Sequence, residues 1–434
     1  MIDVDGFLLP LEAARALFVS DGEWGLEELE GLFVTLGGKP VCDAGSEKLL
    51  VQIRRIDPGS YLGKGKLEEI ARILEARALD LLVVDFELSP SQMKTIEKVT
   101  KKLVLDRSGI ILEIFNRHAR TKEAKLQVEI ARLEYLMPRL TRMWTHFERQ
   151  SGSGGGALKG KGMGEKQIEV DRRLVKDRMN MLHRKLGVVE KSRGLHRRGR
   201  EALLKVALVG YTNAGKSTLL NRLTHSEVHV EDALFATLDA SVRLLNPRSR
   251  PVVLAIDTVG FIDRLPHALV ASFRSTLGEV LEADLLVHVL EGSHPEVRRH
   301  FDVTMAVLKA LEADRIPMLL VLNKMDLLSS PADAATLKVW ATGIARKLSL
   351  EAPVFVSAFS DGDVGLLRER ILKSFESKMT VYEVVVPFED GRTAAKIHEV
   401  GSIEAKRPTE RGTFFRLKTL PEFAEQLNLA RYKV

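Results

Sequence analysis

The sequence predicts a multidomain α/β protein whose main domain has a doubly wound, mainly parallel sheet. Apolar runs of strand length alternate with helical patterns from residue 203 to residue 377, a glycine-rich loop directly follows the first run, and a similar alternation recurs over residues 1–115. Such alternation is typical of parallel strands joined by crossover helices. We expect four parts, namely an N-terminal α/β domain, a basic helical hairpin, the main domain and a small C-terminal α/β module, at residues 1–115, 116–200, 201–378 and 379–434.

Composition supports a globular protein of a reducing compartment. The 434 residues are 45% hydrophobic and 29% charged, which excludes collagen-like and wholly disordered classes. A single cysteine, Cys42, excludes an internal disulfide framework. The N-terminus lacks the basic region of a signal peptide, and no apolar run is long enough to span a membrane. We therefore expect a cytoplasmic protein, and we expect it to be monomeric.

The first 115 residues combine strand-like and helical runs. Helical patterns cover residues 67–78 and 89–100, and Ser89 is an expected N-cap followed by Pro90 at the first helical position. Apolar runs predict strands at 32–38, 49–56, 79–86 and 102–107. In the main domain, the predicted strands are residues 205–210, 251–258, 283–292, 317–324 and 352–358.

The segment between these domains predicts a long helical hairpin. One helix is expected over 116–150, with Pro138 kinking it or ending its regular part, and another over 165–193. Residues 151–164 join them and contain seven glycines. The stretch from Arg117 to Arg200 holds 22 Lys and Arg but 9 Asp and Glu, a net of +13, so the rest of this +6 chain carries −7. This asymmetry indicates either a polyanion-binding surface or a solvated pair of helices.

A phosphate-binding loop follows the strand at 205–210. Residues 210–217 read GYTNAGKS, which matches the pattern G-x-x-x-x-G-K-S and precedes a helical run. Its glycines let successive N–H groups face phosphates, and the helix N-terminus adds its dipole. Lys216 is expected to reach the β- and γ-phosphates, and the Ser217 hydroxyl to bind Mg²⁺. A mere turn before a helix is the weaker interpretation.

Two further elements occur in the order that a GTPase needs. Thr237 lies 21 residues past Lys216, where a switch loop could place it on Mg²⁺ and the γ-phosphate, although this assignment depends entirely on spacing. The sequence DTVG ends the next strand. Asp257 would hold Mg²⁺, and the Gly260 N–H could sense the γ-phosphate.

Guanine specificity is predicted by the sequence NKMD, which begins at Asn323. Asp326 can accept from both the N1–H and the exocyclic amine of guanine, and adenine offers no such pair. Asn323 and the stem of Lys324 would frame the base, and Ser357-Ala358 would supply a backbone N–H to the guanine oxygen. The NKxD pattern alone is weak, but five elements in order, each at a strand end, predict a P-loop GTPase domain at residues 201–378.

The predicted site residues fall into three sets. The catalytic set is Lys216, Thr237 and Gly260. The Mg²⁺ ligands are Ser217, Thr237 and Asp257. The nucleotide-binding set is Gly210, Tyr211, Thr212, Asn213, Ala214, Gly215, Lys216, Ser217, Thr218, Phe235, Thr237, Asp257, Gly260, Asn323, Lys324, Asp326, Ser357 and Ala358.

The sequence departs from the usual template at the position that orients the attacking water. Phe261 stands where a Gln would do so, and a phenyl ring cannot hydrogen-bond water. That duty must pass to another group, to a partner or to a cation. Asn213 could help to coordinate K⁺ there, or it could be a loop-stabilising residue. We expect slow intrinsic hydrolysis of GTP that a partner accelerates.

Several blocks together resemble the HflX family of ribosome-associated GTPases. They include GYTNAGKSTLLNRLT, LFATLDASVR, DTVGFIDRLPHALVASFRSTLGEV and ADLLVHVLEGSHP in the main domain. Upstream, YLGKGKLEEI, LDRSGIILEIF, RHARTKEAKLQVEIARLEYLMPRL and GEKQIEVDRR are similar to that family's N-terminal domain and helical linker. The resemblance covers about residues 30–330. Met163 and the segment LDASVR depart from the commoner family forms.

The resemblance implies a partner and a surface for it. It implies binding to the large ribosomal subunit, GTP-stimulated splitting of ribosomes, and rescue of stalled ribosomes under stress. The glycine loop and its flanking helices would then contact ribosomal RNA through Lys159, Lys161, Arg172 and Arg173. Family members have also been credited with adenine-nucleotide use by the N-terminal domain. Residues 61–66 are a candidate phosphate contact there, but they lack a phosphate-loop signature.

Three functions remain open on the sequence alone. The first is a GTPase that acts on ribosomes, the second is a GTP-dependent RNA-binding or RNA-remodelling protein, and the third is a regulatory module that reports nucleotide state. Zinc chemistry is disfavoured, because the eleven histidines show no ligand spacing and one cysteine cannot form a cluster.

Overall fold

The computed structural model describes residues 14–39, 46–53, 55–139, 163–198, 203–225, 234–235, 241–245, 252–264, 274–328 and 330–433. The chain forms two compact units. The first contains residues 1–189, 233–235 and 264–274, and the second contains 190–232, 236–263 and 275–434. None of the helices in the described residues is long and apolar enough to cross a membrane.

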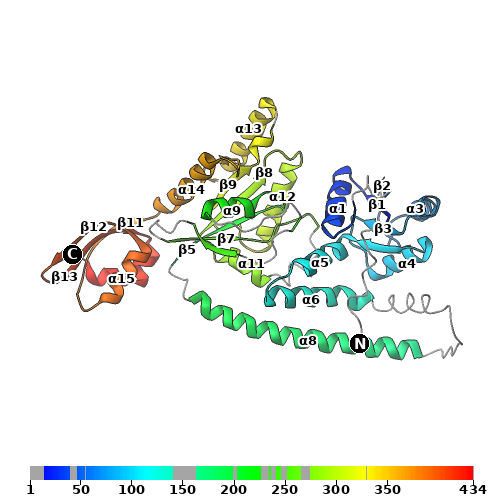
Figure 1. Ribbon diagram of the computed structural model, residues 1–434, viewed down its shortest axis with the longest axis horizontal. Helices are drawn as coiled ribbons and strands as arrows, with labels where there is room; N and C mark the ends of the chain where they lie inside the picture. Colours follow the sequence, from blue (N-terminus) through cyan, green and yellow to red (C-terminus); the bar gives the residue numbers. More distant parts are fainter. Residues whose placement is uncertain are drawn as a thin grey trace. The chain divides into compact units, whose positions relative to one another are not determined.

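The first unit is built around a parallel sheet with the strand order β2-β1-β3-β4 (Figure 1). Strands and helices alternate along the chain: β1 (Ala16–Ser20), α1 (Glu23–Thr35), β2 (Glu47–Leu50), α3 (Lys64–Ala76), β3 (Leu81–Val84), α4 (Pro90–Thr100), β4 (Leu103–Asp106) and α5 (Arg107–His118). The predicted N-terminal α/β domain is confirmed. Ser89 caps α4, since its side chain accepts from the Gln92 N–H and the Gln92 side chain accepts from the Ser89 N–H.

Two of the strands predicted in this region are wrong or misplaced. The run at 32–38 begins inside α1, because Leu29, Leu32 and Leu36 repeat at helical spacing and all are buried. The first strand is instead β1, which is buried along its whole length. The run at 49–56 belongs to the sheet only through its first residues, which end β2.

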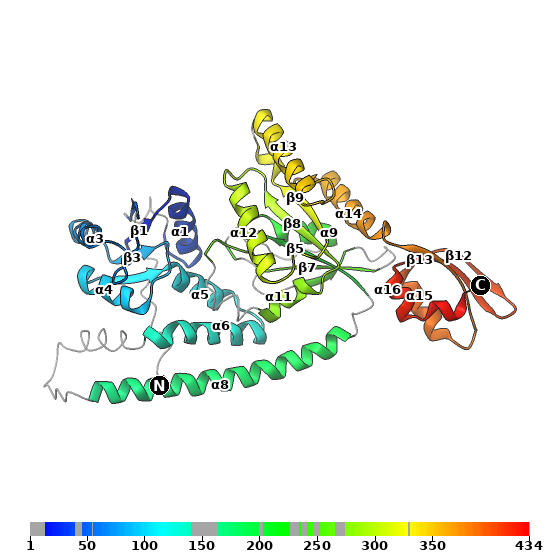
Figure 2. The same ribbon diagram turned by 180° about the vertical axis from the view of Figure 1, so that it is seen from behind.

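Helices α6 (Lys122–Leu136) and α8 (Met163–Arg198) lie side by side (Figures 1 and 2). Ile130 and Leu133 of α6 share one apolar cluster with Val175 and Leu182 of α8. The hairpin pairing is therefore present in the described residues. Arg172 and Arg173 are exposed on α8, whereas Lys159, Lys161 and the glycine loop lie outside the described residues.

The single helix predicted over 116–150 is wrong, because the structure breaks it. α5 ends at His118, and the Thr121 hydroxyl accepts from the Ala124 N–H to begin α6. Pro138 follows α6 within the 3-10 turn η2 (Met137–Arg139), so the prediction that it ends the regular helix is confirmed. Residues 140–150 of the predicted helix lie outside the described residues.

The second unit holds a six-stranded sheet with the order β10-β9-β8-β5-β7-β6. Its strands are β5 (Leu204–Gly210), β6 (Ser241–Leu244), β7 (Val253–Asp257), β8 (Leu285–Glu291), β9 (Met318–Asn323) and β10 (Val354–Phe355). All neighbours are parallel except β6, an antiparallel edge strand that the sequence analysis did not predict. After β5 the chain forms β6 and β7 on one side of that strand. It then crosses to the other side of β5, where β8, β9 and β10 follow in turn. Doubly wound sheets bind ligands where the strand order reverses in this way.

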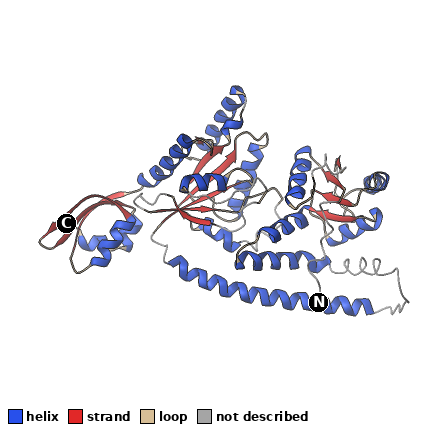
Figure 3. Cartoon of the chain, viewed as in Figure 1, coloured by secondary structure: helices blue, strands red, loops and turns tan. Residues whose placement is uncertain are grey.

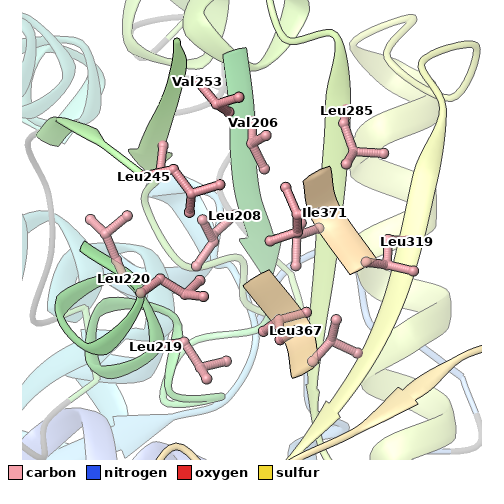
Figure 4. Packing of buried hydrophobic residues seen from close by; sticks show 14 of the residues in the cluster. Val206, Leu208, Leu219, Leu220, Leu245, Val253, Leu285, Leu319, Leu367 and Ile371 are labelled. Carbon is pink, nitrogen blue, oxygen red and sulfur yellow. The ribbon is translucent and has the colours of Figure 1, made fainter. Parts of the chain in front are cut away.

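Helices cover both faces of this sheet. They are α9 (Lys216–Thr224), α11 (Arg274–Leu281), α12 (Val297–Ala310), α13 (Pro331–Lys347) and α14 (Asp361–Glu376). Leu219 of α9 and Leu367 of α14 pack with Val206 and Leu208 of β5 on one face (Figure 4). On the other face, residues of α12 and α13 pack on β8 and β9. The predicted doubly wound, mainly parallel sheet is confirmed.

The C-terminal module is a three-stranded antiparallel sheet with helices packed on it (Figure 3). Its elements are β11 (Thr380–Val386), α15 (Gly391–Val400), β12 (Gly401–Thr409), β13 (Gly412–Thr419), α16 (Pro421–Gln426) and η4 (Leu429–Tyr432). Val400, Leu420 and Phe423 belong to the same apolar cluster as the strands of the six-stranded sheet. The predicted α/β module is therefore present, and it shares a core with the larger sheet.

A buried ionic network lies at the carboxyl ends of the strands in the first unit. The Arg107 guanidinium is 1% exposed and donates to Asp85 Oδ1 at 2.5 Å and to Glu28 Oε2. Burial raises the pKa of the Asp85 carboxyl, and the charge of Arg107 offsets part of that rise. Removing one partner of such a network leaves uncompensated charge in a medium that cannot solvate it.

We expect Arg107→Ala to lower the free energy of unfolding of the first unit by about 3–5 kcal/mol, because the Glu28 and Asp85 carboxylates lose a buried cation, although Arg264 still pairs with Asp85. Urea unfolding followed by circular dichroism measures this change. Arg416→Ala is the matched control, since Arg416 forms an exposed ion pair with Glu404, and its effect should stay below about 1 kcal/mol. Equal effects of the two substitutions would contradict the importance of the buried network.

Candidate functional site

The predicted motifs meet at one edge of the six-stranded sheet. Gly210, Asp257 and Asn323 are the last residues of β5, β7 and β9. Because these strands are parallel, their carboxyl ends lie at the same edge. Residues far apart in sequence are thereby placed around the loop that joins β5 to α9.

The phosphate loop is held by its own lysine. Lys216 is buried, and its Nζ donates to the carbonyl oxygens of Gly210 at 3.2 Å and Tyr211 at 2.8 Å. Gly215 has a φ of +87°, and a Cβ there would lie 2.3 Å from the Asn323 Nδ2. Only glycine fits both that conformation and that approach. The loop is therefore closed around Lys216 at the start of α9.

The electrostatics of Lys216 follow from its burial. Desolvation lowers its pKa to about 8, although the charge of Asp257 acts in the opposite direction. His288, on the neighbouring strand β8, is wholly buried, and burial together with the charge of Lys216 lowers its pKa to about 3. Neither ring nitrogen of His288 has a hydrogen-bond partner among the described residues. The histidine is therefore neutral near pH 7, and it adds no positive charge beside Lys216.

Ser217 and Asp257 face each other across the loop. The Ser217 hydroxyl donates to Asp257 Oδ2 at 2.6 Å, and Asp257 is buried. Hydroxyl and carboxylate oxygens are the hard donors that Mg²⁺ prefers. The two predicted Mg²⁺ ligands are therefore brought together. The third, Thr237, lies outside the described residues.

The segment after Asp257 pairs with the phosphate loop. The Phe261 N–H donates to the Gly210 carbonyl at 3.0 Å, and the Thr212 N–H donates to the Phe261 carbonyl at 2.7 Å. A Cβ on Gly260 would lie 2.8 Å from the Thr212 Cα, so this close approach requires glycine. The Phe261 side chain is 2% exposed. It is therefore buried in the protein, where it cannot position water.

Sequence reasoning missed the partners of Tyr211. Its ring stacks on His300 of α12, with centroids 3.8 Å apart and planes at 7°. Its hydroxyl accepts from the Asp263 N–H at 2.9 Å, and Asp263 pairs with Arg299 at 2.5 Å. Tyr211 therefore links the phosphate loop to the segment after Phe261. No local signal could reveal this, because the partners come from α12 and from the segment after Phe261, both far from Tyr211 in the sequence.

Asn323 connects the phosphate loop with the loop after β10. Its Nδ2 donates to the Ala214 carbonyl at 3.0 Å, and its Oδ1 accepts from the Ala358 N–H at 3.1 Å. The side chain is almost wholly buried. Both ends of the amide are thus used in joining two loops. The backbone N–H expected to face the guanine oxygen was assigned to Ser357-Ala358, and the Ala358 N–H is directed to Asn323. The Ser357 N–H donates to Asp363 Oδ2 at 2.9 Å.

The other residues of the NKMD sequence differ in exposure, since Met325 packs on the apolar cluster of β8 and β9. Lys324 has a φ of +59°, and its Nζ lies 2.9 Å from Glu291 Oε2 at the end of β8. Asp326 lies in the 3-10 turn η3 (Met325–Leu327) and is exposed. Its carboxylate makes no hydrogen bond or ion pair with the part of the chain that the structure describes. Asp326 is therefore available to a ligand.

The remaining predicted residues are placed as follows. Asn213 is exposed, and its φ of +59° is one that Asn tolerates, so K⁺ coordination and loop stabilisation both remain predictions for this residue. Thr218 is half-buried in α9. Phe235 belongs to the first unit, where its ring meets Phe115 edge-on at 4.7 Å. Its predicted contact with nucleotide remains a prediction.

A phosphate loop between β5 and α9, a carboxylate ending β7 beside the loop serine, and an NKxD sequence ending β9 define a P-loop GTPase. Three family models match the chain: GTP-binding GTPase N-terminal over residues 23–116, GTP-binding GTPase Middle Region over 118–200, and 50S ribosome-binding GTPase over 205–324. The chain belongs to the HflX family of GTPases and is a GTP-hydrolysing enzyme.

The relatives match over most of the chain. GTPase HflX of Gluconacetobacter diazotrophicus is 45% identical over 80% of this chain and 73% of its own length. GTPase HflX of Caldanaerobacter subterraneus is 37% identical over 96% of this chain and 94% of its own. A solved GTP-binding protein from Sulfolobus solfataricus, in complex with GDP, is 24% identical, with a TM-score of 0.44 over 83% of this chain and 98% of that one.

The lowered pKa of Lys216 gives nucleotide binding a pH dependence. A phosphate beside the ammonium would raise its pKa above the value of about 8, so binding above that pH requires uptake of a proton. We expect the Kd for GDP to rise by up to about tenfold per pH unit above pH 8. Calorimetry in two buffers of different ionisation enthalpy measures the proton uptake directly.

Lys216→Arg provides the control, because arginine keeps its proton throughout this range. Its affinity for GDP should be lower than that of the wild type and independent of pH. Equal binding enthalpies of the wild type in both buffers above pH 8 would contradict the predicted role of Lys216.

Proposed function

We propose that this GTPase binds the large ribosomal subunit and splits or rescues stalled ribosomes in a nucleotide-dependent way. The family model that matches residues 205–324 is described as a 50S ribosome-binding GTPase. The observation that carries the proposal is the pairing of α6 with α8, which places the most basic part of the chain on one helical hairpin. Lys and Arg on such a surface suit the phosphates of folded RNA.

Helix α8 carries exposed basic residues near its contact with α6. Val175 and Leu182 fix the side of α8 that meets α6, and Arg172 and Arg173 lie exposed on the same helix. We assign ribosomal RNA contacts to these two arginines and to Lys159 and Lys161 of the glycine loop. Glycines would let that loop enter a narrow cleft in the RNA, and the net negative charge elsewhere would disfavour indiscriminate binding.

The nucleotide site assigns a role to each motif. Lys216 and the Gly260 N–H would contact the β- and γ-phosphates, and Thr237 would join them from the switch loop. Mg²⁺, held by Ser217, Asp257 and Thr237, would neutralise charge that develops on the phosphates. The paired oxygens of Ser217 and Asp257 support this site. K⁺ near Asn213 would be a further cation.

Hydrolysis should be slow without a partner. The buried Phe261 leaves the attacking water without a side chain at that position. A ribosome-supplied group, or an ordering of the switch loop by the ribosome, would complete the site. We propose that the protein hydrolyses GTP in the cytoplasm as a monomer.

Sedimentation of intact ribosomes tests the function. With protein and GTP, we expect free subunits to appear, and GDP should give less of this effect because it lacks the γ-phosphate. A non-hydrolysable analogue separates the roles of GTP, since splitting that persists with the analogue assigns hydrolysis to release. Co-sedimentation without free subunits would support a regulatory module, and binding to free RNA without subunit preference would support an RNA-remodelling protein.

The surface is tested with a matched pair of variants. Reversing the charges of Arg172 and Arg173 to Glu, or deleting residues 151–164, should abolish splitting and spare GTP binding. The control reverses Arg346 and Lys347 to Glu on α13, since these two residues are also exposed. Splitting that survives both hairpin changes would show that the assigned surface is wrong.

Base specificity is tested at Asp326. Asp326→Asn should weaken GDP binding by about 10- to 100-fold, because a charged acceptor for two guanine donors is lost. The same change should improve binding of xanthosine diphosphate, whose 2-oxo group can accept from the new amide. Competition binding measures both affinities, and Asp314→Asn, another exposed acid, is the control. An unchanged preference for GDP would exclude Asp326 as the guanine acceptor.

A further inference from the structure

The loop after β10 carries an exposed aromatic side chain beside the proposed base site. Phe359 directly follows Ala358 and is 78% exposed, more than any other exposed Phe, Leu, Ile or Val among the described residues. Single exposed apolar residues are common on protein surfaces, so exposure alone assigns no role. The position and the rigidity of the backbone that carries Phe359 are the informative features.

The backbone around Phe359 is held on both sides. The Phe359 N–H donates to the Ser357 hydroxyl at 3.2 Å, and the Ser360 N–H donates to the Ser357 carbonyl at 3.0 Å. Ser360 then caps α14, since its side chain accepts from the Asp363 N–H at 3.3 Å. The ring is therefore displayed from a fixed turn, although nothing in that turn requires an aromatic residue.

Two cross-links tie this turn to the NKMD sequence. Asn323 accepts from the Ala358 N–H, and the Met325 N–H donates to the Val356 carbonyl at 3.2 Å. The strands that lead into these loops, β9 and β10, are paired parallel neighbours. Phe359 and Asp326 therefore project from two joined loops at the same edge of the sheet.

A nucleotide base has two chemically different parts that a protein can recognise. Hydrogen bonds recognise its polar edge, and apolar or aromatic groups cover its flat faces. The exposed carboxylate of Asp326 is available for such hydrogen bonds. The exposed ring of Phe359 would be shielded from water when a base stacks on it, and this burial of apolar area would favour binding. Lys324 has its Nζ paired with Glu291, so its aliphatic stem is also held at this rim.

We propose that Phe359 is a base-stacking residue that covers one face of the guanine and sets the affinity for the nucleotide. This inference rests on the proposed placement of guanine at Asp326. Stacking depends on the face of the base and not on the groups at its edge. Phe359 therefore adds affinity for any purine that reaches the site, whereas Asp326 selects guanine.

The first test replaces Phe359 in the full-length protein. Phe359→Ala should raise the Kd for GDP about tenfold, which corresponds to about 1.4 kcal/mol. It should raise the Kd for inosine diphosphate by the same factor, because that base has the same stacking face and lacks only the 2-amino group. Phe359→Tyr should keep the wild-type affinity. Phe388→Ala removes another exposed phenylalanine, 65% exposed in the C-terminal module, and should change nothing.

The outcomes separate this inference from the proposed base site. Displacement of bound GDP by ADP as effectively as by GDP itself would overturn the placement of guanine at Asp326, and the stacking inference with it. If the wild type prefers GDP to ADP, and Phe359→Ala binds GDP as tightly as the wild type does, the stacking inference alone is overturned.

A fluorescent variant gives a second readout. Phe359→Trp should show emission that GDP quenches to a greater extent than in the wild type, whose three tryptophans provide the background. Stacking of the base on the indole produces this difference, and added inorganic phosphate should not. Emission that does not respond to GDP beyond the wild-type background would contradict direct contact with the base.

Discussion

The buried amide of Asn323 is the interaction on which the rest of the site depends. Its two hydrogen bonds, to Ala214 and from Ala358, join the phosphate loop to the loop after β10. Both partners are backbone groups, so these two hydrogen bonds join the main chains of the two loops without help from another side chain. Because Gly215 has no Cβ, the amide can come this close to the phosphate loop. The phosphate loop and the loop after β10 are thereby held together.

Charge at the phosphate end is balanced within the protein. Lys216 is buried, and Asp257 supplies the nearby negative charge. The Asp257 carboxylate also accepts a hydrogen bond from the Ser217 hydroxyl. Burial keeps His288 neutral, since a second cation in that interior would be costly. The site therefore presents one buried ammonium at the start of α9, where the helix dipole also favours anions.

Much of the fold could be predicted because the strands of a parallel sheet are continuous apolar runs. β5, β7 and β9 are recognisable for this reason, and the phosphate loop, DTVG and NKMD lie at their ends as predicted. β6 lay outside that pattern, since SVRL is short, half-exposed and antiparallel. The strand assigned at 32–38 failed because Leu29 and Leu32 are spaced for a helix, whereas the local run of apolar residues looked like a strand. The contacts of Tyr211 with His300 and of Lys324 with Glu291 join segments that are distant in the sequence, so no local motif could predict them.

Phe261 brings these observations together. Its backbone pairs with Gly210 and Thr212, so the segment that follows Asp257 is joined to the phosphate loop by main-chain hydrogen bonds. Its side chain is buried, which anchors that segment by apolar packing as well. A glutamine here would need a polar partner for its amide in the same buried space. The position therefore stabilises the loop by packing and main-chain hydrogen bonds, and its side chain offers no hydrogen bond to a water molecule.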